Sequence, residues 1–219
     1  MTEPAEPTAP TDPASEPIVG VLALQGGVDE HLRVLDELGV AHRKVRLPSH
    51  LEGLSALVLP GGESTTMSKL MRFNGLVDPL REALSGGLPA YGTCAGMILL
   101  ASTVLDTRED AVQLGALDVT VRRNAFGRQV DSFETSLDFT GVDGDVPATF
   151  IRAPWVEEVG DGVEVLATVP EGPAAGAIVA VRAGAVMATS FHPEVDGDVR
   201  IHRLFLRECA GLDLAPASV

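Results

Sequence analysis

The fold is decided by the pentapeptide Gly92-Thr93-Cys94-Ala95-Gly96, which joins a predicted buried strand to a predicted helix. The strand ends in residues 88–91 (LPAY), and the apolar run of residues 95–105 (AGMILLASTVL) predicts the helix. A nucleophile on so sharp a turn, between small residues, is typical of the G-x-S-x-G elbow, here with sulfur in place of oxygen. A helix N-terminus and a nearby histidine both stabilise a thiolate, so Cys94 is a candidate nucleophile.

A histidine and a carboxylate suited to the same site follow much later, in His192-Pro193-Glu194. Residues 185–190 predict a strand, which places His192 at its carboxyl end, where open α/β sheets bind ligands. His192 can act as the base and Glu194 can orient its imidazole, which predicts Cys-His-Glu acyl transfer. Two alternatives compete: a lone cysteine is more often a small buried apolar residue, and zinc deaminases share the H-x-E pair. The P-C-x-x-C of the deaminases is absent, and no metal is expected.

Composition restricts the partners of the chain. It has 219 residues, enough for one domain, and a formal net charge of −15. A surface this acidic repels nucleic acid and anionic lipid, so neither is expected as a partner. Cys94 and Cys209 are too few for a disulfide framework, and no signal peptide or membrane-spanning run is evident. We therefore expect a cytoplasmic protein.

The chain divides into three segments. Residues 1–17 are rich in Pro, Glu, Ala and Thr and predict a disordered tail, residues 18–211 predict the globular domain, and residues 212–219 a C-terminal tail. In the first half, predicted strands (18–24, 41–45, 54–59) alternate with predicted helices (29–38, 67–73). The second half predicts mainly antiparallel strands, including a hairpin of residues 177–181 and 185–189, and a last helix near 199–210. This order is typical of an α/β fold with a largely parallel sheet.

A second motif, P-G-G-E-S-T-T at residues 60–66, follows the predicted strand 54–59. Its two glycines let the backbone approach a ligand closely, and Ser64, Thr65 or Thr66 is expected to cap the next helix. The backbone N–H groups of Gly62 and Ala95 would then form an oxyanion hole. A plain glycine turn is the alternative, whereas a phosphate-binding loop lacks the required spacing.

Six motifs in this order resemble class I glutamine amidotransferases and, more narrowly, the glutaminase subunits of pyridoxal 5′-phosphate synthase. They are LQG at 24–26, PGGESTT at 60–66, GTCAG at 92–96, RNAFGRQVDSFE at 123–134, FIRAP at 150–154 and SFHPE at 190–194. The resemblance implies a single-domain, flavodoxin-like class I glutamine amidotransferase fold over residues 18–211. In that fold, a central, mostly parallel sheet carries flanking helices and an antiparallel β extension.

The resemblance also implies the reaction. L-Glutamine would be hydrolysed to L-glutamate and ammonia through a γ-glutamyl thioester on Cys94, with His192 as base and then acid and Glu194 orienting it. The ammonia would pass to a separate synthase (lyase) subunit, which makes pyridoxal 5′-phosphate from a pentose phosphate and a triose phosphate. A large hetero-oligomeric complex and no cofactor are expected.

The remaining site residues are carried over by position. The implied glutamine-binding residues are Gly61, Gly62, Glu63, Arg123, Ile151 and Arg152. An arginine suits the α-carboxylate of glutamine, although a solvated turn charge is the alternative for Arg123. The loop with Gln25 is expected to couple partner docking to activity. Other families remain open: the glutaminase of another amidotransferase, such as that of histidine biosynthesis, a non-catalytic interaction protein on the same fold, and a cysteine peptidase or stress protein of related architecture.

Overall fold

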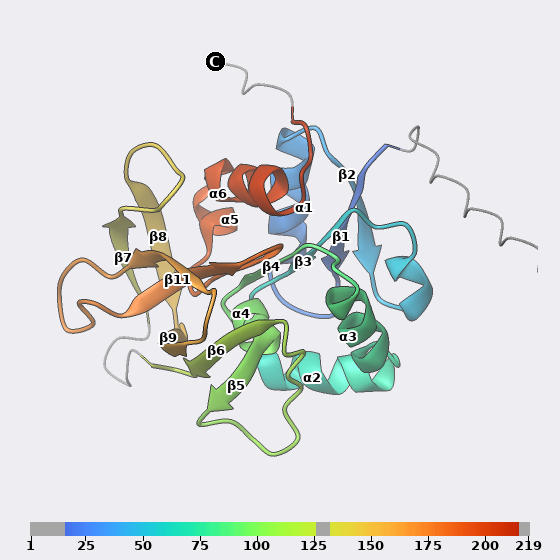
Figure 1. The fold of residues 1–219 in the computed structure, drawn as a ribbon, viewed down its shortest axis with the longest axis horizontal. Coiled ribbons are helices and arrows are strands. Elements are labelled where there is room, and N and C mark those ends of the chain that lie inside the picture. The colour runs from blue at the N-terminus through green and yellow to red at the C-terminus, as the bar shows by residue number, and fades with distance from the viewer. Residues whose placement is uncertain (1–15, 126–131, 215–219) are drawn as a thin grey trace, which may run out of the picture.

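The computed structural model describes residues 16–125 and 132–214 (Figure 1). Most of the predicted N-terminal tail, residues 126–131 of the RNAFGRQVDSFE motif and the end of the predicted C-terminal tail lie outside these ranges. Leu212 and Leu214, at the start of that C-terminal segment, pack against the core.

Ten of the described strands form the main sheet, in the order β2-β1-β3-β4-β12-β11-β9-β6-β5, with β10 paired to β11. The strands are β1 (Ile18–Leu22), β2 (Ala41–Val45), β3 (Ala56–Leu59), β4 (Ala90–Thr93), β5 (Ala101–Leu105), β6 (Leu117–Arg122), β9 (Trp155–Val159), β10 (Glu164–Thr168), β11 (Ile178–Ala183) and β12 (Val186–Thr189). From β2 to β12 every neighbour is parallel, whereas β12, β11, β9 and β6 pair antiparallel. The strands β7 (Ser132–Leu137) and β8 (Val146–Ile151) form a separate antiparallel pair. The predicted α/β fold with an antiparallel extension is confirmed.

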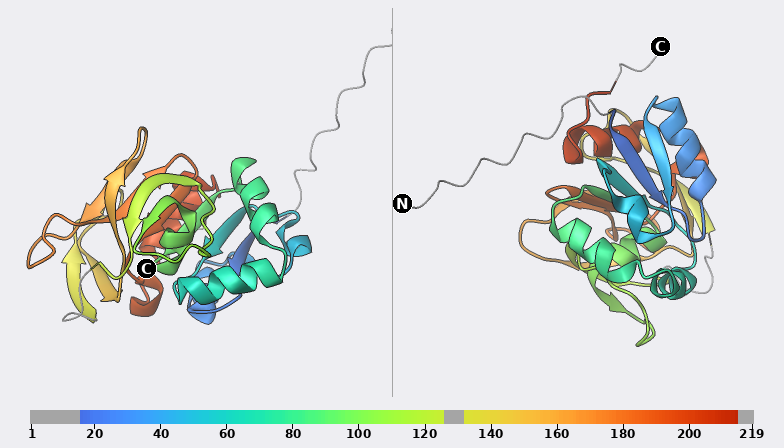
Figure 2. Two further views of the ribbon diagram at one scale, coloured as in Figure 1. Left: turned by 90° about the horizontal axis from the view of Figure 1, so that it is seen from below. Right: turned by 90° about the vertical axis from the view of Figure 1, so that its right-hand side faces the viewer.

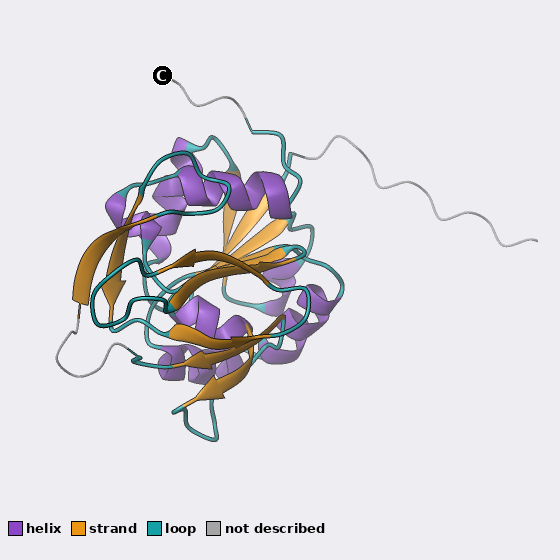
Figure 3. Ribbon diagram, turned by 60° about the vertical axis from the view of Figure 1, so that its left-hand side comes forward, coloured by secondary structure: helices purple, strands orange, loops and turns teal. Residues whose placement is uncertain are grey.

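Helices cover both faces of the parallel half (Figures 2 and 3). On one face α1 (Val28–Glu37) and α6 (Arg200–Leu204) bury Leu35 and Ile201 against β1 and β3. On the other face α2 (Ser64–Phe73), α3 (Val77–Ser85) and α4 (Ala95–Leu100) bury Met67, Leu80 and Leu99. Two apolar cores therefore hold the sheet rigid between them, and the described helices include none long and apolar enough to cross a membrane.

The parallel pairing of β4 with β12 brings two distant motifs together. Thr93 lies opposite Thr189 at the carboxyl ends of these neighbouring strands. The N–H of Cys94 donates a hydrogen bond to the carbonyl of Thr189 at 2.8 Å. The residues that follow the two strands, Cys94 and His192, therefore emerge at the same edge of the sheet.

The prediction of one helix over residues 95–105 is wrong. The helix α4 ends at Leu100, and Ala101 adopts an extended backbone with φ −61° and ψ 149°. Residues 101–105 instead form β5, in which Thr103 and Val104 pair with Thr120 and Val121 of β6. Since β-branched residues favour strands where a partner strand is available, tertiary pairing overrides the apolar pattern here.

Four further elements of the described residues were not predicted: the helix α3, the strand β9, a 3₁₀ turn over Pro48–Leu51 and a short helix over Pro193–Asp196. The hairpin of β11 and β12 is confirmed, with Ala183 opposite Val186. The last predicted helix begins with α6 and continues as a π-helical turn over Phe205–Cys209. A short helix, α5 (Pro193–Asp196), lies between β12 and α6 and carries the carboxylate of the late motif.

Candidate active site

Cys94 lies on a strained turn between β4 and α4. Its φ of 47° is in the left-handed region, which few residues other than glycine adopt. The backbone of this turn packs closely against that of β3, since a Cβ on Gly96 would lie 2.1 Å from the Leu59 carbonyl oxygen. A Cβ on Gly92 would lie 2.5 Å from the carbonyl carbon of Gly96. The two glycines of the pentapeptide are therefore required by space, and they allow the thiol to stand at the start of a helix.

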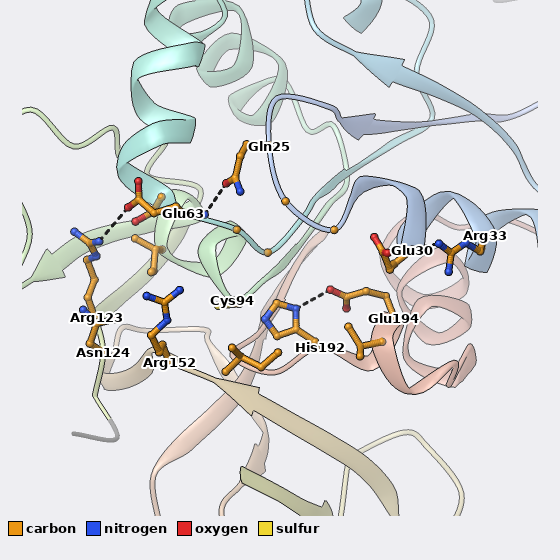
Figure 4. A pocket seen from close by; sticks show the side chains of 18 residues that line it. Gln25, Glu30, Arg33, Glu63, Cys94, Arg123, Asn124, Arg152, His192 and Glu194 are labelled. Carbon is orange, nitrogen blue, oxygen red and sulfur yellow. Dashed lines mark hydrogen bonds and ion pairs between the residues drawn. The ribbon is translucent and has the colours of Figure 1, made fainter. Parts of the chain in front are cut away.

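His192 and Glu194 form a hydrogen-bonded pair beside this turn. Nδ1 of His192 lies 2.8 Å from Oε1 of Glu194, and the Glu194 side chain is fully buried. Because α5 starts at Pro193, directly after His192, the helix carries the carboxylate back toward the imidazole. Figure 4 shows His192 between Cys94 and Glu194. This is the arrangement that an activated nucleophile requires: nucleophile, base and a third group that orients the base.

The surroundings of His192 favour its protonated, positively charged form. Burial alone would lower the pKa of His192, but the polar side chains of Cys94 and Glu194 outweigh burial and raise that pKa from 6.5 to about 10. Burial would raise the pKa of Glu194, yet the influence of His31 and the hydrogen bond with His192 lower it to about 2. At neutral pH His192 is therefore an imidazolium that faces a carboxylate on one side.

A cavity of about 630 Å³ opens over Cys94, His192 and Glu194. Every site residue predicted from sequence lines it except Ala95, which is buried in the first turn of α4. The predicted residues that share this cavity are Gln25, Gly61, Gly62, Glu63, Cys94, Arg123, Ile151, Arg152, His192 and Glu194. The structure thus gathers residues from six separate motifs into one space.

The glycine turn after β3 is fixed by side-chain hydrogen bonds. The N–H of Glu63 donates to Oε1 of Gln25 at 2.7 Å, which ties this turn to the loop after β1. The prediction that a hydroxyl side chain caps α2 is wrong. The carboxylate of Glu63 accepts from the N–H groups of Thr65 at 2.9 Å and Thr66 at 2.7 Å. Burial would raise the pKa of Glu63, but these bonds lower it to about 2, so the cap stays ionised.

Two arginines stand at one end of the cavity (Figure 4). Arg123 lies 3.7 Å from Oε1 of Glu63 and is mostly buried. Arg152 has a φ of 44°, and among the described residues no carboxylate pairs with it. A guanidinium without an acidic partner, facing a cavity, is suited to bind a carboxylate.

The predicted oxyanion donors belong to the turn after β3 and to the start of α4. Gly62 follows Gly61 in the turn, and a Cβ on Gly62 would lie 2.5 Å from Oε1 of Gln25. Ala95 is the first residue of α4, so its N–H has no acceptor within the helix.

Sequence reasoning missed a polar cluster behind the site. Thr93, His31 and His202 are completely buried, and the rings of the two histidines approach to 2.8 Å between Nδ1 of His31 and Nε2 of His202. The only local signal was His31 on a predicted apolar helix face, where a histidine is unusual. Its partners are distant in sequence, so no local pattern could have identified them.

Comparison with known proteins agrees with this geometry. Residues 21–211 match the SNO glutamine amidotransferase family. The pyridoxal 5′-phosphate synthase subunit PdxT of Nocardia farcinica is 64% identical over 203 residues, covering 92% of this chain and 88% of that protein. The protein of the same name from Rhodococcus jostii is 65% identical over 195 residues, covering 88% and 96%. A crystal structure of a glutamine amidotransferase, 49% identical, matches with a TM-score of 0.81 over 89% of this chain and 99% of that one. The resemblance to class I glutamine amidotransferases is confirmed, and the chain belongs to the SNO glutamine amidotransferase family.

Proposed function

We propose that this chain is the glutaminase subunit of a pyridoxal 5′-phosphate synthase. The observation that carries the proposal is the strained Cys94 elbow beside an imidazole that Glu194 holds at 2.8 Å. The relatives named above extend the proposal to the pathway, because they are pyridoxal 5′-phosphate synthase subunits of similar length.

The first half of the reaction forms a thioester. The Cys94 thiolate attacks the side-chain amide carbon of glutamine, and the N–H groups of Gly62 and Ala95 stabilise the resulting oxyanion. His192 gives its proton to the amide nitrogen, the carbon–nitrogen bond breaks, and ammonia leaves. The γ-glutamyl group remains on the sulfur.

The second half returns the enzyme to its starting state. His192, now neutral, takes a proton from water as the water attacks the thioester carbon. The carbon–sulfur bond breaks, glutamate leaves and the thiolate faces an imidazolium again. Glu194 keeps one tautomer and one ring orientation throughout, because its Oε1 accepts from Nδ1 and leaves Nε2 for the proton transfers.

The charges of the cavity orient the substrate. Arg152, with Arg123 beside it, binds the α-carboxylate of glutamine, and Gly61, Gly62, Glu63 and Ile151 line the space that the rest of the molecule occupies. The side-chain amide of the substrate then points toward Cys94. The guanidinium and the thiol act on opposite ends of one small ligand, which favours glutamine over amides that lack an α-carboxylate.

The partner is a synthase subunit that receives the ammonia within a large hetero-oligomeric complex. Gln25 couples docking of the partner to activity, because the Gln25 side chain holds the backbone of the glycine turn that contains the oxyanion donor. We expect Gln25→Ala to dock normally and to lose stimulation by the partner. Unchanged stimulation would contradict this role.

Release of glutamate from glutamine, with and without the cognate synthase subunit, tests the proposal. We expect strong stimulation by the partner, loss of activity in Cys94→Ala and retained activity in Cys209→Ala, the matched control at the other cysteine. Activity indifferent to the partner would place the glutaminase in another pathway. Absence of activity under both conditions would leave a non-catalytic protein on this fold.

A further inference from the structure

A chain of buried polar side chains continues from Glu194 into the core. Nε2 of His31, from α1, lies 3.4 Å from Oε1 of Glu194 and 3.2 Å from Oγ1 of Thr93. Nδ1 of His31 lies 2.8 Å from Nε2 of His202, from α6. His31, His202 and Thr93 have no exposed surface. The mechanism above uses none of these three side chains.

The Glu194 carboxylate makes its side-chain contacts through one oxygen, Oε1. Oε1 faces three groups: Nδ1 of His192 at 2.8 Å, Nε2 of His31 at 3.4 Å and Oγ1 of Thr93 at 3.5 Å. Oε2 is buried, and no hydrogen-bonding group of the described residues reaches it. Since burying a carboxylate oxygen without a donor is costly, the donors on Oε1 must hold the carboxylate in this orientation.

The donors and acceptors allow one consistent placement of the protons. The Thr93 hydroxyl donates its proton to Oε1 of Glu194, so Oγ1 of Thr93 accepts from Nε2 of His31, which must carry a proton. A neutral His31 then accepts at Nδ1. His202 therefore donates from Nε2, which leaves its Nδ1 without a proton. That assignment fits, because Nδ1 of His202 is buried with no hydrogen-bond partner among the described residues. A charged His31 would force a buried, unsatisfied N–H onto His202 instead.

Burial favours the same neutral state. It lowers the pKa of His31 and lowers the pKa of His202 from 6.5 to about 3. The titratable groups that act on His31 are Glu194, His192 and Glu30, together with its neighbour His202.

Thr93 also accepts a hydrogen bond from the Gly61 N–H at 2.9 Å. The cluster thus links the carboxylate of the triad to the glycine turn of the substrate cavity.

We infer that His31 is a positioning residue for the reaction: its Nε2–H, with Thr93, holds Oε1 of Glu194 against His192, and His202 fixes the tautomer of His31 that makes this possible. The inference rests on the proposed glutaminase function. His31 does not line the substrate cavity, so it acts on the reaction through Thr93 and Glu194.

Paired substitutions at position 31 test the inference in the complex with the synthase subunit. His31→Gln keeps an N–H donor close to the position of Nε2, whereas His31→Phe keeps the bulk and removes the donor. We expect kcat of His31→Phe to fall about 10- to 100-fold, with little change in KM, because the hydrogen bond of Thr93 to the charged Glu194 is disturbed. His31→Gln restores most of kcat. Alkylation of Cys94 by a diazo ketone analogue of glutamine, which must take a proton before the thiolate displaces nitrogen, is followed against pH. The fall of its rate at alkaline pH is expected at a lower pH in His31→Phe than in wild type.

Several results would overturn the inference. One is a kcat of His31→Phe within twofold of wild type, whatever its melting temperature, because the role would then be structural. Equal losses in His31→Phe and His31→Gln would show that the donor is not what matters. If His31→Phe does not fold, His202→Gln against His202→Leu gives the same comparison of donor with bulk. A wild-type complex that releases no glutamate would instead contradict the proposed function.

Discussion

Gly61 lies so close to the imidazole of His192 that a Cβ at position 61 would stand 2.2 Å from Cε1. The ring of the proposed base therefore packs on the bare backbone of the glycine turn. This contact sets the position of the His192 ring together with the hydrogen bond between Nδ1 and Glu194. It also makes the turn part of the catalytic geometry, in addition to any role in binding glutamine.

Gly61→Ala is expected to displace the His192 ring and to lower kcat/KM about 100-fold, since a misplacement of about 1 Å can have that effect. Gly86→Ala is the matched control, because a Cβ there would also make a tight contact, 3.1 Å from the Glu82 carbonyl oxygen, at a φ of −74°. Gly86 does not line the cavity. Glutamate release measured with the synthase subunit, beside circular dichroism of both variants, checks the pair. Equal activity of the two variants would show that the ring tolerates displacement.

Arg152→Gln is expected to raise the KM for glutamine about 10- to 100-fold, the effect of losing a hydrogen bond to a charged group, with a smaller change in kcat. Arg33→Gln is the control, because Arg33 lines the other end of the cavity and pairs with Glu30 at 3.5 Å. Steady-state kinetics over a range of glutamine concentrations separate the two parameters. A wild-type KM in Arg152→Gln would mean that the α-carboxylate binds elsewhere.

The pKa of His192 predicts how activity changes at alkaline pH. His192 must carry a proton to release ammonia, and its pKa is about 10 instead of 6.5. Activity is therefore expected to persist above pH 8 and to fall as the pH passes about 10. Glu194→Gln removes the carboxylate that helps to raise this pKa, so the alkaline fall moves to lower pH, and the rate drops by about 100-fold or more.

Alkylation of Cys94 by a diazo ketone analogue of glutamine, which also needs a proton from the site, measures this profile in the isolated subunit without titration of the partner. The rate constant is followed from pH 6.5 to 10.5 in wild type and Glu194→Gln. Coincident profiles would mean that Glu194 does not act on the charge of His192.

The sequence predicted the parts of this molecule that depend on local pattern. The strands β1, β3 and β4 are short apolar runs, and the LQG, PGGESTT and GTCAG motifs lie at or just after their carboxyl ends. The strand β9 escaped prediction because only Val156 of its five residues is fully buried. Residues 95–105 are apolar apart from Ser102 and Thr103, and no glycine or proline marks the change from helix to strand after Leu100.

The candidate site also has a part that local sequence patterns predict and a part that they do not. The residues of its motifs could be named from sequence, because each motif is contiguous. The cluster behind them could not, since His31 bonds to a residue 171 positions away and to another 62 positions away. Only the parallel pairing of β4 with β12, and the packing of α1 beside α6, brings those side chains together.

The buried histidines predict the stability of the protein in mild acid. His202 has a pKa of about 3 in the fold, below its unfolded value of 6.5, and burial lowers that of His31 as well. Below pH 6.5 the unfolded chain takes up protons that the folded chain does not. His202 should therefore contribute a fall of about 1.4 kcal/mol per pH unit to the free energy of unfolding, and His31 a fall in the same direction. Urea unfolding between pH 6.5 and 5.0 measures the slope. His202→Leu should reduce it at an unchanged m-value; an unaltered slope would show that His202 is protonated in the fold.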